Sequence, residues 1–151
     1  MKNCGIRTTT QGRIAVEGYL WGSDATTLLS HLDNNNKFNV IILSDTVHNS
    51  ISYINKKVFN HSEHQSLVKS LLLNLEKNTD SRVYVFYTHH RPWLKEKDLE
   101  FFNITSQEGF TAEDLLVQRV TPMFEDDRGD ETERGTVYGR SLKWSSSVKN
   151  F

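Results

Sequence analysis

The chain has 151 residues, of which 36% are apolar and 25% are charged, and its formal net charge is −1. This size and composition predict one folded domain and exclude a chain that is disordered throughout. The nearly balanced charge gives no indication of a nucleic-acid-binding or membrane-surface protein.

Three features of the sequence favour a reducing, cytoplasmic setting. Cys4 is the only cysteine, so no disulfide can form within the chain. The opening residues, MKNCGIRTTTQGR, lack the apolar region of a secretion signal. No apolar run approaches the ~20 residues that a helix needs to cross a bilayer. We therefore expect a cytoplasmic protein with neither a membrane nor a nucleic-acid partner.

The first elements in chain order are a strand, a short helix and a second strand. RIAVEGYLWG, Arg13–Gly22, alternates apolar and polar residues at first and ends in an aromatic pair and glycine, which predicts a strand. Ser23 or Asp24 can cap the short helix that follows, which ends in an asparagine run. The continuous apolar run Phe38–Ser44 is typical of a strand covered on both faces, as in parallel sheets.

A longer helix is predicted from Asn60 onwards. Asn60 with Glu63, or Ser62 with Gln65, can form a capping box at its start. The apolar residues then recur at the spacing that places side chains on one face of a helix. These residues are Leu67, Val68, Leu71, Leu72 and Leu75.

The second half of the chain predicts a strand, a helix and an antiparallel strand pair. The strand is Ser81–Thr88, and HHRPWL after it is a loop because Pro92 pushes Arg91 towards extended backbone. A helix follows over Leu94–Glu108. The strand pair is EDLLVQRVTPMF and RGTVYGRSLKW, on either side of an acidic segment interpreted as a solvated hairpin tip. This order predicts an α/β layered sheet, with ligands at the carboxyl ends of its strands.

Four segments of the chain resemble one protein family. They are EGYLWGSD, IILSD, VFNHSEH and HHRPWLKEKDLEFF. Together they are similar to the second half of the family 16 class I methyltransferases, in the fungal branch that methylates the N-terminus and lysine of translation elongation factor 1-alpha. The resemblance extends from about Arg13 to Trp144. It implies a protein N-methyltransferase with S-adenosyl-L-methionine as cofactor and elongation factor 1-alpha as protein substrate.

The resemblance also implies a Rossmann-like α/β fold, truncated at one end. The family sheet has the strand order 3-2-1-4-5-7-6, with strand 7 antiparallel. On that template Arg13–Tyr19 is strand 3, Phe38–Leu43 is strand 4 and Ser81–Tyr87 is strand 5, and the last two strands are 6 and 7. Strands 1 and 2 and the glycine-rich cofactor loop have no counterpart. We therefore expect a partial domain over residues 1–151, with a bare sheet edge at strand 4.

The resemblance gives four residues a role in the site. Trp21 is expected to lie against the adenine of the cofactor, because a flat indole offers stacking area. Ser44, just after strand 4, is expected to line the methionine side of the pocket. Asp45 and Phe59 are the expected catalytic pair, the acid and the aromatic ring that hold the substrate amine beside the sulfonium methyl group. The alternatives are a core or rim aromatic at a turn for Trp21 and a turn or helix-cap aspartate for Asp45.

An inserted segment separates the two expected catalytic residues. Without a gap, the family's aromatic position falls on His48; if Val47–Lys57 is skipped, it falls on Phe59. The insertion is either a surface loop or a retained short intron, since a valine codon begins with GT and a lysine codon can end in AG.

Other interpretations stay open. A chain without the glycine-rich loop can be an inactive remnant, and the family's older description as nicotinamide N-methyltransferase-like suggests a small-molecule substrate. His61 and His64 lack a third ligand at suitable spacing, so no metal site is predicted. His89 and His90 follow a central strand at the expected active-site face, either as a pocket wall or substrate contact, or as a surface turn.

Overall fold

The computed structural model describes residues 14–33, 36–46, 61–122 and 128–146. Helices and strands alternate along most of the chain, which confirms the predicted α/β class. In chain order the elements are α1 (Thr26–Leu29), β1 (Val40–Ser44), α2 (His61–Asn74), β2 (Arg82–Thr88), the short 3-10 helix η2 (Pro92–Leu94), α3 (Lys95–Gln107), β3 (Phe110–Arg119), α4 (Glu131–Arg134) and β4 (Thr136–Trp144).

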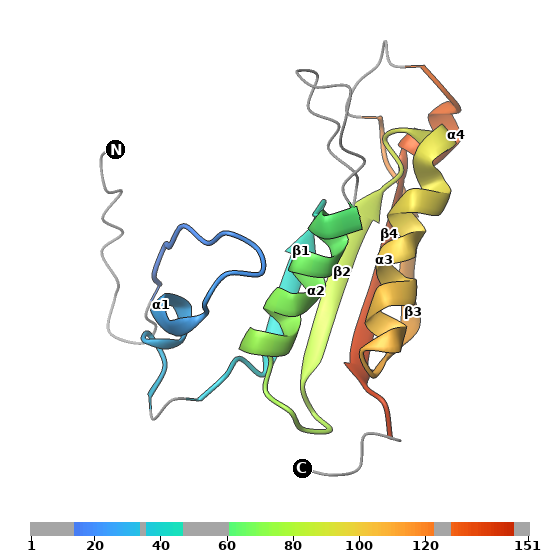
Figure 1. Ribbon diagram of the computed structural model, residues 1–151. Coiled ribbons are helices and arrows are strands. Elements are labelled where there is room, and N and C mark those ends of the chain that lie inside the picture. The colour runs from blue at the N-terminus through green and yellow to red at the C-terminus, as the bar shows by residue number, and fades with distance from the viewer. Residues whose placement is uncertain (1–13, 34–35, 47–60, 123–127, 147–151) are drawn as a thin grey trace.

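The four strands form one mixed sheet in the order β1-β2-β4-β3 (Figure 1). β1 and β2 are parallel, with Ser44 opposite Phe86. β4 runs antiparallel to both β2 and β3, so the predicted antiparallel pair is confirmed. Because β4 runs against β1 and β2, its first residues lie at the sheet end where β1 and β2 finish. This end of the sheet carries the candidate site.

The hydrophobic core lies between the sheet and the helices α2 and α3, which run side by side over one face (Figure 1). The predicted apolar face of α2 is confirmed, since Leu67, Val68 and Leu71 are at most 2% exposed. Leu75, directly after α2, is fully buried. The other buried core residues are Leu43, Val83, Val85, Tyr87, Phe101, Phe102, Phe110, Leu142 and Trp144.

The face of β1 opposite the core is open, which corrects the prediction of a strand covered on both faces. Val40 and Ile42 alternate with the core residue Leu43 and are 51% and 66% exposed. Among the described residues, β1 also has a neighbouring strand on one side only. An apolar strand with one open face and one open edge is a site for association with another chain segment.

The predicted strand over Arg13–Tyr19 is wrong for its described part, since residues 14–20 belong to no strand. Ile14 and Val16 are 64% and 77% exposed. A strand needs a partner for its backbone N–H and C=O groups, and no described strand pairs with this segment. The apolar alternation alone is therefore not sufficient to place these residues in the sheet.

Helix boundaries differ from the predictions in small ways. Asp24 Oδ1 accepts a hydrogen bond from the Thr26 backbone N–H at 2.8 Å, so the predicted aspartate supports the start of α1, one residue before the N-cap position. The predicted capping box of α2 depends on Asn60 and on the Ser62 side chain, which lie outside the described part. β3 begins at Phe110, earlier than predicted, because Gly109 at φ +90° turns the chain directly after α3.

No helix in the described ranges combines the length and the apolar character needed to span a bilayer.

Candidate functional site

The candidate site begins where β1 ends. The Asp45 backbone N–H donates to the Phe86 carbonyl oxygen at 2.8 Å, so pairing with β2 continues one residue beyond Ser44. Asp45 has φ +50°, in the left-handed region that few residues other than glycine adopt. Aspartate is among the side chains that tolerate this conformation, and such backbone positions are frequent at functional sites. The carboxylate is 46% exposed at the carboxyl end of the sheet.

His90 faces this carboxylate from the turn after β2. Its Nε2 atom lies 3.8 Å from Asp45 Oδ1, which is within ion-pair range and longer than a direct hydrogen bond. The His90 backbone N–H donates to the Thr88 carbonyl oxygen at 2.9 Å, which fixes the turn. The two parallel strands thus bring together an acid and an imidazole that are 45 positions apart in the sequence.

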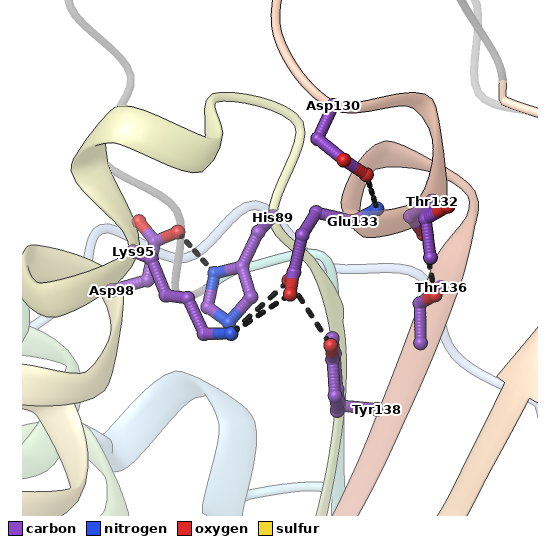
Figure 2. A network of polar contacts seen from close by, with 8 residues as sticks. All are labelled: His89, Lys95, Asp98, Asp130, Thr132, Glu133, Thr136 and Tyr138. Carbon is purple, nitrogen blue, oxygen red and sulfur yellow. Dashed lines mark hydrogen bonds and ion pairs between the residues drawn. The ribbon is translucent and has the colours of Figure 1, made fainter.

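The preceding histidine is buried and paired. His89 is 1% exposed, and its Nδ1 atom lies 2.8 Å from Asp98 Oδ2 in the first turn of α3 (Figure 2). The rings of Tyr87 and Tyr138 each have their centroid 5.3 Å from that of His89. A buried polar group needs such a partner, because it has left water. The pair therefore fastens the start of α3 to the end of β2, on either side of the turn that carries His90.

A second polar network joins α3 to the β3–β4 connection (Figure 2). Lys95 Nζ lies 3.1 Å from both carboxylate oxygens of Glu133. The Tyr138 hydroxyl donates to Glu133 Oε2 at 3.1 Å, and Asp130 caps α4 by accepting the Glu133 backbone N–H at 3.0 Å. The acidic segment is therefore not only a solvated hairpin tip. Its last acidic residue, Glu133, holds α4 against α3 through Lys95.

This network makes the stability of the protein depend weakly on pH. The hydrogen bond with Lys95 lowers the pKa of Glu133 below its ordinary value near 4.5. The stabilisation is therefore complete above that value and is lost as the pH falls through the lower folded-state pKa. Both side chains are about a third exposed, so we expect Glu133→Gln to lower the free energy of unfolding by about 0.5–1 kcal/mol at pH 7.

Urea unfolding at pH 7 and pH 3 measures this effect. The difference between wild type and Glu133→Gln should shrink at the lower pH, because the contribution of ionised Glu133 is lost as the pH falls below the ordinary pKa of the carboxyl group. Glu131→Gln, on the same short helix, is the matched control, since Glu131 is exposed. An equal loss for both variants, or a loss that does not shrink between pH 7 and pH 3, would contradict a specific Lys95–Glu133 contribution.

The structure brings together two of the four predicted site residues. Ser44 and Asp45 are consecutive at the end of β1, and Ser44 is exposed. Trp21 lies on a separate turn that is docked on α2, where the Gly22 backbone N–H donates to Ser70 Oγ at 2.8 Å. Trp21 is 38% exposed, so part of the residue is accessible. Phe59, together with His48 and the rest of the insertion Val47–Lys57, lies outside the described residues.

A hollow of about 530 Å³ lies elsewhere, between the segment before α1 and the residues that follow α1. None of the four predicted site residues lines it. Its walls are Ala15, Glu17, Leu28, Ser30, His31, Leu32, Asp33 and Phe38. Within the described ranges, no three or more His, Cys, Asp or Glu side chains are grouped so that they could hold a metal ion.

No role in the site was predicted for Asp98, Lys95, Glu133 or Tyr138. The pairing of His89 with Asp98 has one weak signal in the sequence, a histidine at a strand end followed by an acid in the first turn of the next helix. No sequence signal indicates the contacts of Lys95 and Tyr138 with Glu133, because these contacts depend on how the β3–β4 connection folds back.

Several fungal proteins are similar to this chain over most of its length. A Schizosaccharomyces pombe protein described as "Protein N-terminal and lysine N-methyltransferase efm7" is 43% identical over 132 residues, which cover 86% of this chain and 48% of that protein. Proteins with the same description from Neurospora crassa and Gibberella zeae are 38% and 34% identical and cover 87% and 97% of this chain, with 44% and 55% of their own lengths matched. The chain thus spans about half the length of these relatives. No protein-family model matches it.

Proposed function

Because the chain is a homologue of the fungal protein N-terminal and lysine N-methyltransferases EFM7, we propose that it forms the substrate-side part of an S-adenosylmethionine-dependent protein N-methyltransferase. The observation that carries this proposal is the 43% identity to the fission-yeast relative over 86% of the chain. The descriptions of the relatives name protein termini and lysines, which favours a protein substrate over a small molecule. On the resemblance of the four sequence segments, translation elongation factor 1-alpha is the proposed substrate.

The sheet order supports this assignment. We take β1, β2, β4 and β3 as strands 4, 5, 7 and 6 of the family sheet, whose order is 3-2-1-4-5-7-6. The antiparallel direction of β4 agrees with that of strand 7. In this arrangement the open edge of β1 is where strand 1 pairs, so Ser44 and Asp45 stand at the switch point of the sheet. In open α/β sheets, ligands bind at the carboxyl ends of the strands around this point.

The described residues fit one side of a cofactor site. Ser44 is small and exposed at a strand end, which lets a ligand approach the backbone, and the half-exposed indole of Trp21 offers a stacking face. These two residues would hold the methionine and adenine ends. S-adenosylmethionine, when bound, supplies an electrophilic methyl group on a sulfonium. No described residue belongs to a glycine-rich loop, so we expect the 151-residue chain alone to bind the cofactor poorly.

The Asp45 carboxylate is proposed to receive the substrate amine. A lysine or N-terminal amine arrives as a cation, which the exposed carboxylate attracts. It must then pass one proton to water, to which the half-exposed site is open, so that its nitrogen lone pair can lie in line with the methyl group. Holding the amine in that position is the main task of the protein, since good alignment accounts for a large share of the rate in such displacements. Phe59 would form the aromatic wall of the same position.

Methyl transfer from labelled S-adenosylmethionine to purified elongation factor 1-alpha tests the proposal. The assay compares the 151-residue chain with the same chain joined to the unmatched part of the fission-yeast relative. We expect transfer by the joined protein and a loss of roughly a hundredfold for Asp45→Asn, because the amine is no longer held in line. Asp80→Asn, an exposed aspartate just before β2, is the control.

Two outcomes would overturn the proposal. A joined protein that methylates no protein substrate would contradict the methyltransferase assignment. Micromolar binding of S-adenosylmethionine to the 151-residue chain alone, measured by calorimetry, would contradict the incomplete cofactor site.

A further inference from the structure

The two consecutive histidines after β2 occupy opposite environments. His89 is buried in the Asp98 pair, whereas the His90 side chain is 20% exposed and faces Asp45. The relatives' descriptions and the four-residue site prediction assign nothing to His90. Its position beside the proposed amine-holding carboxylate raises the question of what the imidazole does there.

Ordered backbone fixes both partners of the Asp45–His90 pair. On one side, the Asp45 N–H is bound to the Phe86 carbonyl, one residue beyond the parallel register of β1 and β2. On the other side, the His90 N–H is bound to the Thr88 carbonyl, and the buried His89–Asp98 pair holds the flanking backbone. The sheet and the turn therefore hold the two backbones at a separation from which the side chains approach to 3.8 Å.

The Asp45 side chain needs such a partner if it is to work as an amine holder. The carboxylate is nearly half exposed and can rotate towards bulk water. A neighbouring imidazole N–H attracts one carboxylate oxygen and so favours the orientation in which the other oxygen is available to a ligand. Other charged groups just after β2 and on α3 and α4 have their own partners, His89 with Asp98 and Lys95 with Glu133.

We propose, on the basis of the proposed function, that His90 is a positioning residue for Asp45, so that the two side chains together receive the ammonium group of the substrate. His90 Nε2 orients the carboxylate, and the ammonium binds to the oriented carboxylate. The role of His90 is therefore exerted through Asp45. Loss of His90 should matter only while Asp45 is present, whereas a structural role in the turn would matter in either case.

The test is an NMR titration of the 151-residue chain with Nα-acetyl-lysine amide, whose side chain carries the ammonium group. Nε-acetyl-lysine amide, which is neutral, is the control probe. Binding is measured at pH 8 for wild type, Asp45→Asn, His90→Ala, His90→Asn and the double variant Asp45→Asn/His90→Ala. Urea unfolding of each variant checks that the fold is retained.

We expect the charged probe to move the His90 and Asp45 signals in the wild type and the neutral probe to leave them in place. His90→Ala should weaken binding roughly threefold, the size expected for the loss of one partly exposed electrostatic contact. His90→Asn, which keeps an N–H donor, should recover part of that loss. In the Asp45→Asn background, His90→Ala should have no further effect, because coupled residues are not additive.

Three results would overturn the inference. They are no response of the pair to the charged probe, an unchanged affinity in His90→Ala, and a His90→Ala loss that persists without Asp45. None of them requires methyl transfer. A joined protein that binds the probe through the pair but methylates no protein substrate would instead count against the proposed function.

Discussion

Replacing Phe101 by alanine is expected to lower the free energy of unfolding by about 3–5 kcal/mol. Phe101 is fully buried on α3, where this helix packs against α2. Its ring makes edge-to-face contacts with His64 and Phe102, at centroid distances of 5.9 and 5.3 Å. Truncation removes this apolar area and leaves a cavity between two helices that are fixed on the sheet. The site should be affected as well, because α3 carries Asp98 and Lys95.

Urea unfolding followed by circular dichroism measures this loss. Phe101→Leu keeps most of the apolar volume and should lose less than Phe101→Ala. Asn103→Ala, on the exposed side of the same helix, should stay within about 0.5 kcal/mol of the wild type. If Phe101→Ala and Asn103→Ala unfold at the same urea concentration, Phe101 does not hold α3 to the core.

Elements whose pattern reflects burial could be predicted from the sequence. The recurring leucines of α2 and the apolar run of β2 were enough to place both, because each element buries one continuous face. The segment from Arg13 to Tyr19 has a similar local pattern but forms no strand in its described part. The difference is the partner, since strand formation depends on a neighbouring backbone that a local pattern does not reveal. Likewise, the continuous apolar run of β1 led to the prediction that both of its faces are covered, whereas one face is open, because the run does not reveal what packs against it.

The candidate site could be predicted only in part. Ser44 and Asp45 were placed correctly at a strand end, because the alternation of strands and helices determines where parallel strands finish. The left-handed backbone of Asp45 and its distance to His90 could not be predicted, since both depend on how two turns fold at the end of the sheet. The contact of Lys95 with Glu133 depends on the docking of α4, to which no sequence pattern corresponds.

The buried pair of His89 and Asp98 gives the second large effect. Asp98 is 3% exposed and His89 is 1% exposed, so neither has water as an alternative partner. Asp98→Ala leaves the His89 Nδ1 atom buried without its acceptor, and we expect a loss of about 2–4 kcal/mol in the free energy of unfolding. Asp98→Asn retains an amide oxygen as acceptor and should lose less.

A double-mutant cycle with His89→Ala measures the coupling between the two residues, with Glu96→Ala as the control from the same turn of α3. Glu96 is exposed, so its loss should stay within about 0.5 kcal/mol. If the His89 and Asp98 losses are additive, or if Asp98→Ala resembles Glu96→Ala, the pair does not fasten α3 to β2.

The expected coupling between His89 and Asp98 has a consequence for the site. The turn between His89 and Asp98 carries His90, so a loosened pair should also weaken the binding of a lysine ammonium group beside Asp45. A protein that keeps this binding in Asp98→Ala would show that the sheet alone positions His90.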